Sequence, residues 1–316
     1  MKIHNISLSG KGILAPMAEY SNLPFRLLAK EFGAGLVYTE MVMAKGIVQK
    51  DKEELRLLRT SPQEKPVIAQ ICGEVCEEMR DAAIAIESLG FAGVDINLCC
   101  PINRIIKKGA GAALMDNPNK IEEMVGMVAN ATKLPITVKI LSGINAQKIN
   151  AIEIAKICEA KGAKAIAIHP RTLEQGYVGE ADWPLIAQMK KAVSIPVIGS
   201  GDIRTPLHAK KMLEETNCDA IMVARGCLGQ PWFFREFNHL VSTGYAPSKL
   251  SYSQMKQILL RHAKMLKEHA AGTKGVMLLR KHLSYYSKNM NKEEFGKAVR
   301  NIKTFKEFDD AVRNYL

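Results

Sequence analysis

The sequence predicts an eight-stranded parallel β/α barrel, the (β/α)8 or TIM fold, followed by a small bundle of helices. In residues 1–243 of the 316-residue chain, short apolar runs alternate with amphipathic helical patterns. The alternation occurs about eight times over roughly 230 residues, which is the count and length of a (β/α)8 barrel. Beyond residue 243 only helical patterns remain. We therefore expect a barrel domain over 1–243 and a helical domain over 244–316.

Apolar runs rich in β-branched residues are the predicted strands. They are Ile13–Met17, Leu36–Thr39, Val67–Ile71, Gly93–Leu98, Ile136–Ile140, Ala165–His169, Pro196–Gly199 and Ala220–Ala224. Nearly continuous apolar character is typical of parallel strands that are buried on both faces. A doubly wound open sheet is the alternative, but it usually has fewer units and a glycine-rich loop after its first strand. Here Pro16-Met17-Ala18 stand at that point.

Amphipathic helices are predicted between the strands. They include Cys76–Leu89, Pro118–Ala131, Ile149–Lys161, Trp183–Ala192 and Pro206–Glu215. The interval between the fourth and fifth strands is longer than the others, and the extra residues, 99–117, directly follow the fourth strand. In a barrel, this places a long loop at the carboxyl-terminal mouth, where active sites lie.

The C-terminal part is helical and basic. After a linker at Tyr245-Ala246-Pro247-Ser248, the helices expected are Tyr252–His269, Lys274–Ser287, Lys292–Ile302 and Phe305–Tyr315. Residues 244–316 hold 15 Lys and Arg against 6 Asp and Glu, or +9 of the total net charge of +12. Such asymmetry indicates a polyanionic partner, and the alternative is a basic face kept for solubility.

The cysteines and the N-terminus suggest a cytoplasmic protein. The seven cysteines have no spacing typical of zinc ligands, so we expect free thiols in a reducing compartment and no metal. The first residues contain no apolar segment of the signal-peptide kind. Since no run approaches about 18 apolar residues, we also expect no membrane partner.

Polar residues are predicted at almost every strand end that faces the mouth. At the earlier strands the polar residues are Glu40, Gln70, Asn97, Lys139, His169 and Arg171. The first strand is the exception and ends in Pro16, Met17 and Ala18. Lys139 is interpreted as a Schiff-base nucleophile, a phosphate or flavin anchor, or a solvated rim residue. His169 is either a hydrogen-bonded core histidine or a cofactor contact.

Two small-residue turns follow the seventh and eighth strands. They contain Gly199, Ser200, Gly201 and Asp202, and Ala224, Arg225 and Gly226. Loops at these places form the usual phosphate site of barrels, because glycine lets backbone N–H groups approach phosphate oxygens. The pair of turns therefore predicts a phosphorylated ligand.

Cys100 is the strongest candidate for chemistry. It opens the long mouth loop and precedes Pro101, which fixes the direction of the chain after the thiol. A free cysteine is most often a small buried hydrophobic residue, which is our interpretation of most of the others. An ordinary thiol is mostly protonated at neutral pH, which suits a general acid.

These motifs together resemble the tRNA-dihydrouridine synthase family over nearly the whole chain. The matching segments are Leu14-Ala15-Pro16-Met17, Thr39-Glu40-Met41, Ala69-Gln70-Ile71-Cys72-Gly73, Val94-Asp95-Ile96-Asn97-Leu98, Cys100-Pro101, Gly109–Leu114, Val138-Lys139, His169, Arg171-Thr172, Gly201-Asp202-Ile203, Ala224-Arg225-Gly226, Gly229-Gln230-Pro231-Trp232, Arg280-Lys281-His282 and Tyr285-Tyr286. Each motif alone is weak, and their order and spacing are specific.

The resemblance implies a barrel that binds FMN and a helical domain that binds RNA. It implies that NADPH (or NADH) reduces FMN, that hydride passes to C6 of a flipped-out uridine, and that Cys100 protonates C5. FMN contacts are implied for Met17, Gln70, Lys139, His169, Gly201, Ala224, Arg225 and Gly226, with Pro16, Ala18, Gly199, Ser200 and Asp202 beside them. Substrate contacts are implied for Asn97, Glu40, Arg171, Arg280, Lys281 and His282.

The chain departs from the family pattern at several positions. Cys99 stands where glycine is usual, Leu141 where arginine is usual, Ser200 where asparagine is common and Pro170 where glycine or alanine is common. From the resemblance as a whole we expect a monomeric flavoenzyme that reduces uridines of tRNA. The alternatives are the same reaction on rRNA, a barrel reductase for a small molecule, a Schiff-base enzyme that uses Lys139, and an RNA-binding protein without activity.

Overall fold

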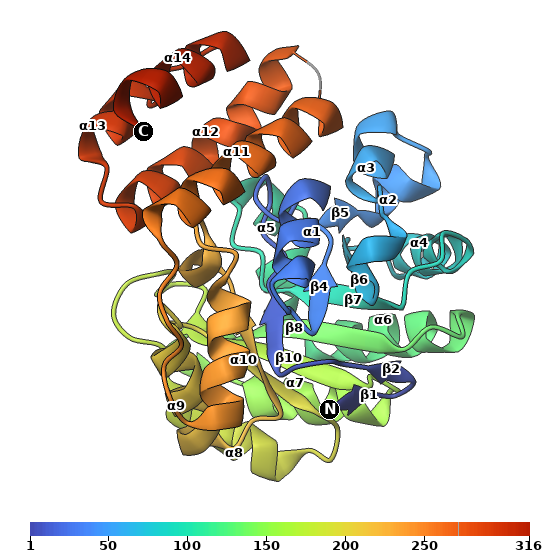
Figure 1. Ribbon diagram of the computed structural model, residues 1–316. Helices are drawn as coiled ribbons and strands as arrows, with labels where there is room; N and C mark the ends of the chain where they lie inside the picture. Colours follow the sequence, from blue (N-terminus) through green and yellow to red (C-terminus); the bar gives the residue numbers. More distant parts are fainter. Residues whose placement is uncertain (271) are drawn as a thin grey trace.

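The computed structural model describes residues 1–270 and 272–316, and its centre is a closed barrel of parallel strands (Figure 1). The barrel strands are β3 (Gly12–Leu14), β4 (Leu36–Tyr38), β6 (Val67–Cys72), β7 (Gly93–Leu98), β8 (Ile136–Asn145), β10 (Ala165–Thr172), β11 (Val197–Ser200) and β12 (Ala220–Val223). Each pairs in parallel with the next, and β12 pairs with β3 to close the sheet. The predicted fold class and all the predicted strands are confirmed.

The interior of the barrel is apolar at its N-terminal end. A hairpin of β1 (Lys2–Ile3) and β2 (Ile6–Ser7) was not predicted. Its residues Ile3 and Ile6 belong to one buried cluster with Ile13, Leu36 and Ile68 of the barrel strands. The hairpin therefore seals this end of the barrel, and a ligand reaches the interior from the carboxyl ends of the strands.

Helices cover the outside of the barrel. They are α1 (Leu23–Glu31), α2 (Ala44–Val48), α3 (Lys52–Leu57), α4 (Cys76–Ser88), α6 (Pro118–Ala131), α7 (Ala151–Ala160), α8 (Trp183–Ala192), α9 (Pro206–Thr216) and α10 (Phe233–Thr243). The five helices predicted between strands are confirmed to within about two residues. Helices α1, α2, α3 and α10 were not predicted. Helix α1 has a clear local cause, because the side chain of Asn22 accepts the N–H of Phe25 at 3.2 Å.

The long loop after β7 lies at the mouth, as predicted. Residues 99–117 contain a short helix, α5 (Asn103–Ile106), and a 3-10 helix, η2 (Gly111–Asp116). Further short elements are the strands β5 (Val42–Met43) and β9 (Lys148–Ile149), and the 3-10 helices η1 (Pro62–Glu64) and η3 (Arg225–Cys227). The loop is therefore folded, and η2 packs on β7 and β8.

The remaining chain forms a helical cluster with its own core. Its helices are α11 (Tyr252–His269), α12 (Gly272–Asn289), α13 (Glu293–Ala298) and α14 (Phe305–Tyr315), close to the predicted ranges. They lie together at one end of the molecule, with α11 packed on α1 (Figure 1). Leu259, Leu279, Phe295 and Phe308 are among their buried residues. Within the described residues, no helix is long and apolar enough to cross a membrane.

Candidate active site at the barrel mouth

Inward-facing polar side chains line the barrel strands, most of them at the carboxyl ends and two, Asp95 and Thr137, deeper in the barrel. They are Glu40 after β4, Gln70 on β6, Asp95 and Asn97 on β7, Thr137 and Lys139 on β8, His169 and Arg171 on β10, and Ser200 on β11. Alternation along each strand explains the arrangement, because Val94, Ile96 and Leu98 of β7 point outward into the core beneath the helices. The mouth is therefore polar, and the layer outside it is apolar.

Four of these side chains form a continuous hydrogen-bonded chain. Asp95 is fully buried and accepts the Thr137 hydroxyl at 2.6 Å and Gln70 Nε2 at 2.8 Å. Gln70 Oε1 accepts Asn97 Nδ2 at 2.8 Å. Burial raises the pKa of Asp95 to about 6, against the lowering effect of its hydrogen bonds and of Lys139. The carboxyl group is thus ionised at pH 8.

The turn that carries the two adjacent cysteines is fixed by Asn97. Its Oδ1 accepts the backbone N–H groups of Cys99 and Cys100, each at 2.9 Å. Cys100 is 7% exposed, and burial raises the pKa of its thiol. The thiol therefore stays protonated at neutral pH. Lys139 Nζ lies 3.2 Å from the sulfur of Cys99, which is less buried than Cys100.

The two small-residue turns after β11 and β12 touch each other. A Cβ on Gly226 would lie 2.1 Å from the carbonyl oxygen of Ile203. Gly201 has a φ of +109°, and a Cβ there would lie 2.8 Å from that of Ala181. Glycine is required at both positions, since a side chain at 226 would push the two turns apart and one at 201 would collide with the loop after β10. Gly199 differs, because a Cβ on it would meet Met212 of α9, outside the barrel.

His169 and Arg225 face the mouth beside these turns. His169 Nε2 is buried and has no hydrogen-bond partner among the described residues. Burial lowers the pKa of His169 to about 3, so the ring is neutral at physiological pH. Arg225 stacks its guanidinium 4.6 Å from the ring centroid of Tyr177, and the ring of Tyr177 also meets His169 edge-on. The loop that carries Tyr177 thus closes one side of the mouth.

Arg171 and Asp202 are engaged with each other. Arg171 Nη2 donates to both carboxylate oxygens of Asp202, at 2.7 and 3.0 Å, and to the carbonyl of Gly179 at 2.5 Å. Asp202 also accepts the N–H of Ala181 at 2.8 Å. The side chains of both residues therefore hold the loop after β10 against β11. Arg171 retains two buried nitrogens, Nε and Nη1, without a partner in the part of the chain that the structure describes.

Glu40 connects the mouth to the helical cluster. Its carboxylate accepts the backbone N–H of Glu19, whose own side chain forms an ion pair with Lys281 of α12. Burial raises the pKa of Glu40 to about 7. Pro16, Met17 and Ala18 lie in the same segment after β3, so this segment joins the barrel interior to α12. The positive charge of Lys281 is thus partly balanced by the carboxylate of Glu19.

His282 is placed in the interior and not on the surface. It is fully buried between α12 and the barrel, with its ring 4.9 Å from Phe25, 5.3 Å from Tyr20 and 4.6 Å from His262. Burial lowers the pKa of His282 to about 3, and lowers that of His262 as well. Both rings are therefore neutral at physiological pH.

The buried histidines predict a loss of stability in mild acid. In the unfolded chain they bind protons near pH 6.5, whereas the folded state resists protonation. The contribution of these histidines to the free energy of unfolding should be constant above about pH 6.5 and fall below it, by up to about 1.4 kcal/mol per pH unit for each histidine. Urea titrations from pH 8 to 4.5 measure this slope. His282→Phe should reduce it, whereas the same slope in His282→Phe and in the exposed control His239→Gln would contradict the assignment.

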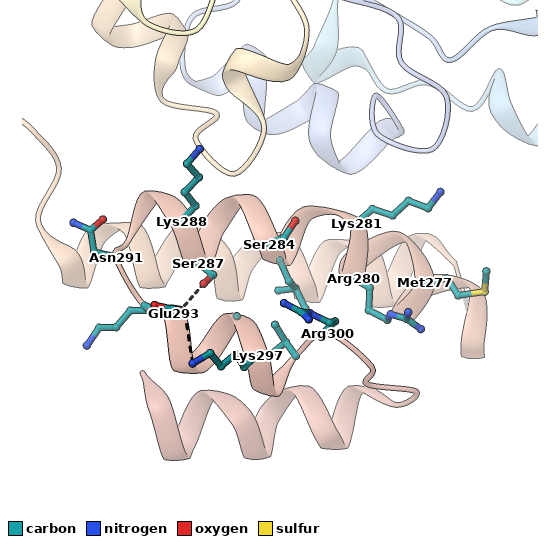
Figure 2. Close-up of a pocket in the computed structure, with 14 residues that line it drawn as sticks. Met277, Arg280, Lys281, Ser284, Ser287, Lys288, Asn291, Glu293, Lys297 and Arg300 are labelled. Carbon is teal, nitrogen blue, oxygen red and sulfur yellow. Dashed lines mark hydrogen bonds and ion pairs between the residues drawn. The ribbon is translucent and has the colours of Figure 1, made fainter. Parts of the chain in front are cut away.

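A basic groove of about 800 Å³ lies in the helical cluster. Its lining includes Arg280, Lys281, Lys288, Lys292, Lys297 and Arg300 and, among the described residues, one acidic side chain, Glu293. Figure 2 shows Arg280, Lys297 and Arg300 between α12 and α13, whereas Lys281 and Lys288 point toward the barrel. Six of the 15 Lys and Arg residues of 244–316 therefore line one groove, and one of them, Lys281, reaches Glu19 of the barrel domain.

Sequence reasoning missed several residues of the site. Asp95 was not predicted as a site residue. Because it stands two residues before Asn97 on a buried strand, its carboxylate must face the barrel interior as Asn97 does. Tyr177 lies in a loop with no strand or helix signal to place it. Glu19 has a φ of +66°, which the residue type does not reveal. No sequence signal was found for Tyr177 or Glu19.

A closed barrel with polar groups at the carboxyl ends of its strands defines a (β/α)8 enzyme. Solved reductases share this fold. Morphinone reductase aligns with a TM-score of 0.57 at 13% identity, over 81% of this chain and 91% of its own. A 2-naphthoyl-CoA reductase complex aligns with a TM-score of 0.60 at 15% identity, over 77% of this chain and 51% of its own. At these identities the likeness is one of fold alone.

The chain belongs to the dihydrouridine synthase (Dus) family, whose sequence model matches residues 13–316. It is 37% identical over 321 aligned residues to tRNA-dihydrouridine synthase B of Escherichia coli strain K12, covering 100% of this chain and 99% of that protein. The protein of the same name from Pseudomonas syringae pv. tomato is 38% identical over 275 residues, covering 87% and 81%. The family resemblance drawn from the motifs is confirmed.

Proposed function

We propose that this protein reduces the C5=C6 bond of uridines in tRNA to 5,6-dihydrouridine, with a flavin as the redox group and NADPH as reductant. Membership of the Dus family and relatives named as tRNA-dihydrouridine synthases support this reaction. The observation that carries it here is the Asn97-bound turn. It holds a protonated thiol, Cys100, next to Cys99, which contacts Lys139, at the end of the barrel that the N-terminal hairpin leaves open.

The mouth fits a flavin mononucleotide. The two touching turns follow β11 and β12, where barrels usually bind a phosphate through backbone N–H groups, and Arg225 supplies positive charge. The unpartnered His169 Nε2 and the ammonium of Lys139 offer donors to the ring system. Met17 and Gln70, with the neighbouring Pro16, Ala18, Ser200 and Ala224, complete the proposed surface. When bound, the flavin supplies the hydride that C6 of the uracil receives.

Cys100 is proposed to supply the proton that C5 receives. The thiol proton leaves Sγ, and the thiolate left behind takes a proton from water before the next turnover. Because burial raises the thiol pKa, the proton is present at neutral pH. Asn97 holds the turn, and Lys139 keeps positive charge beside it.

We propose that residues 1–243 form the catalytic domain and 244–316 the RNA-binding domain. The basic groove between α12 and α13 supports this division, because phosphates are bound by clustered lysine and arginine. Lys288, which points from α12 toward the barrel, offers a positive charge on the way from the groove to the barrel. A uridine must leave its stack to enter, since a stacked base cannot reach the barrel interior.

Neutralising the groove should weaken tRNA binding and its salt dependence. In Arg280→Gln/Arg300→Gln, the slope of log affinity against log salt should fall by about 1 for each phosphate that is no longer bound. Filter binding between about 50 and 300 mM salt measures this slope. The matched control is Lys303→Gln/Lys306→Gln, which removes the same charge from the start of α14 and its preceding turn. Equal effects of the two pairs would argue for nonspecific charge.

The reaction is tested with purified protein, NADPH and an unmodified tRNA transcript. We expect a yellow protein that consumes NADPH in proportion to dihydrouridine found by mass spectrometry of the digested tRNA. Parallel assays with rRNA and with free uracil derivatives distinguish the alternative substrates. Rapid NADPH oxidation with a free small molecule and no change in tRNA would contradict the proposal.

A further inference from the structure

The carboxylate of Asp95 has no assigned role, although it is fully buried below the mouth. Two elements besides its own supply its hydrogen bonds, Gln70 from β6 and Thr137 from β8. The charged and titratable groups that influence it are Lys139 on β8 and the hydroxyl of Tyr38 on β4. Leaving an ionised group in such a place is costly unless it is hydrogen-bonded, so its retention calls for a reason.

An ionised carboxylate can only accept hydrogen bonds, and this dictates the orientation of the next amide. Gln70 must turn Nε2 toward Asp95, at 2.8 Å, so its Oε1 points to Asn97. Asn97 must then present Nδ2 to that oxygen, also at 2.8 Å. Its Oδ1 is left facing the opposite way. One buried charge thereby selects one of two orientations at each amide.

The last amide in this chain holds the reactive turn. Asn97 Oδ1 accepts the N–H groups of both Cys99 and Cys100 at 2.9 Å. If the amide were reversed, its NH2 group would face two further donors, and the turn would have to move. The position of the Cys100 thiol therefore depends on which way Gln70 faces, although Gln70 does not touch the sulfur.

We propose that Asp95 is a positioning residue for Cys100, acting through the amides of Gln70 and Asn97 to fix the turn that carries the thiol. This inference rests on the proposed role of Cys100 as proton donor. Asp95 itself touches neither the thiol nor the surface at which a uridine would enter. If Asp95 only filled space or balanced the charge of Lys139, the position of the Cys100 turn would not depend on which atoms of Gln70 and Asn97 face each other.

A pair of exchanged side chains tests whether the contact between residues 95 and 70 is coupled to the turn that carries Cys100. Gln70→Glu places two carboxylates face to face, which can share a proton only at lower pH. Adding Asp95→Asn restores every hydrogen bond with the roles exchanged: the new asparagine donates to the new glutamate, which still accepts from Asn97. The double variant thus keeps the orientation of Asn97 while moving the charge by one residue.

Two readouts are followed at pH 8 and pH 6, after flavin content and thermal unfolding have been checked. The first is the rate at which iodoacetamide labels Cys100, read by peptide mass spectrometry. The second is kcat for dihydrouridine formation in tRNA. Gln70→Glu should accelerate labelling and lower kcat, each by about tenfold at pH 8, a typical coupling within one hydrogen-bond network, with partial recovery at pH 6. In Asp95→Asn/Gln70→Glu the labelling rate should return to within about threefold of wild type at both pH values, whereas no recovery of kcat is required because Gln70 also belongs to the proposed flavin surface.

Thr137→Val is the matched control, because it removes a hydrogen bond to the same carboxylate but lies off the route to Cys100. It should leave labelling of Cys100 unchanged. A double variant no better than Gln70→Glu in labelling, or a Thr137→Val variant equally disturbed, would overturn the inference. The labelling arm does not depend on the reaction. If the double variant is labelled no more like wild type than Gln70→Glu is, the positioning role of Asp95 is wrong. If the Cys100→Ala enzyme is active, the proton-donor role of Cys100 is wrong.

Discussion

Replacing Cys100 by alanine is expected to lower the rate of dihydrouridine formation by about 10²–10⁴-fold, the usual contribution of a positioned general acid. The physical reason is that, without the protonated thiol, C5 would have to take its proton from water. Single-turnover reduction of a tRNA transcript measures the effect. Flavin content and tRNA affinity should be unchanged, because the Asn97 hydrogen bond is made to the backbone of Cys100 and survives the substitution.

Cys99→Ala is the control for this prediction. Cys99 is adjacent, is less buried and contacts Lys139 at 3.2 Å, so it shares the surroundings of Cys100. Its alanine variant should remain active. If Cys99→Ala were inactive and Cys100→Ala active, the proton donor would have been assigned to the wrong thiol.

Removing the carboxylate of Glu64 should destabilise the protein by about 3–5 kcal/mol, the cost of leaving its buried partner unpaired. Glu64 and Arg26 are 0% and 1% exposed, and Arg26 Nε lies 2.6 Å from Glu64 Oε2. Arg26 also donates to the backbone carbonyls of Ser21 and Arg59. This cluster therefore ties the segment after β3 to the loop before β6. Chemical denaturation of Glu64→Ala measures the loss.

The exposed ion pair between Lys274 and Glu53 provides the comparison. Glu53→Ala should leave stability essentially unchanged, since exposed pairs are screened by water and salt. Arg26→Met/Glu64→Leu should recover much of the stability lost in Glu64→Ala, because it leaves no unpaired buried charge. A Glu64→Ala protein as stable as Glu53→Ala would show that the buried pair contributes nothing.

The barrel could be predicted because its strands carry a strong local signal. Runs such as Ile136–Ile140 and Ala165–His169 are short and mostly apolar, and a charged or titratable residue stands at or near the end of each. That pattern also located Lys139 and His169 at the mouth. The N-terminal hairpin was missed, because strands of two residues are too short for a periodic pattern to be recognised.

Side-chain partnerships could not be predicted from the sequence. Arg171 was expected to contact substrate, but its guanidinium pairs with Asp202, which lies on another strand's loop. His282 follows two basic residues, yet helical periodicity turns it toward the barrel while Arg280 faces the groove. Such partners are set by the barrel closure and by the docking of α12, which bring together residues far apart in the chain.

Mapping dihydrouridine in tRNA and rRNA from cells that lack this gene is the decisive test of the proposed reaction. We predict that defined tRNA positions lose dihydrouridine on deletion. Wild-type and Cys99→Ala genes should restore it, and a Cys100→Ala gene should not. Restoration by the Cys100→Ala gene, or a loss confined to rRNA, would show that the proposed chemistry or the proposed substrate is wrong.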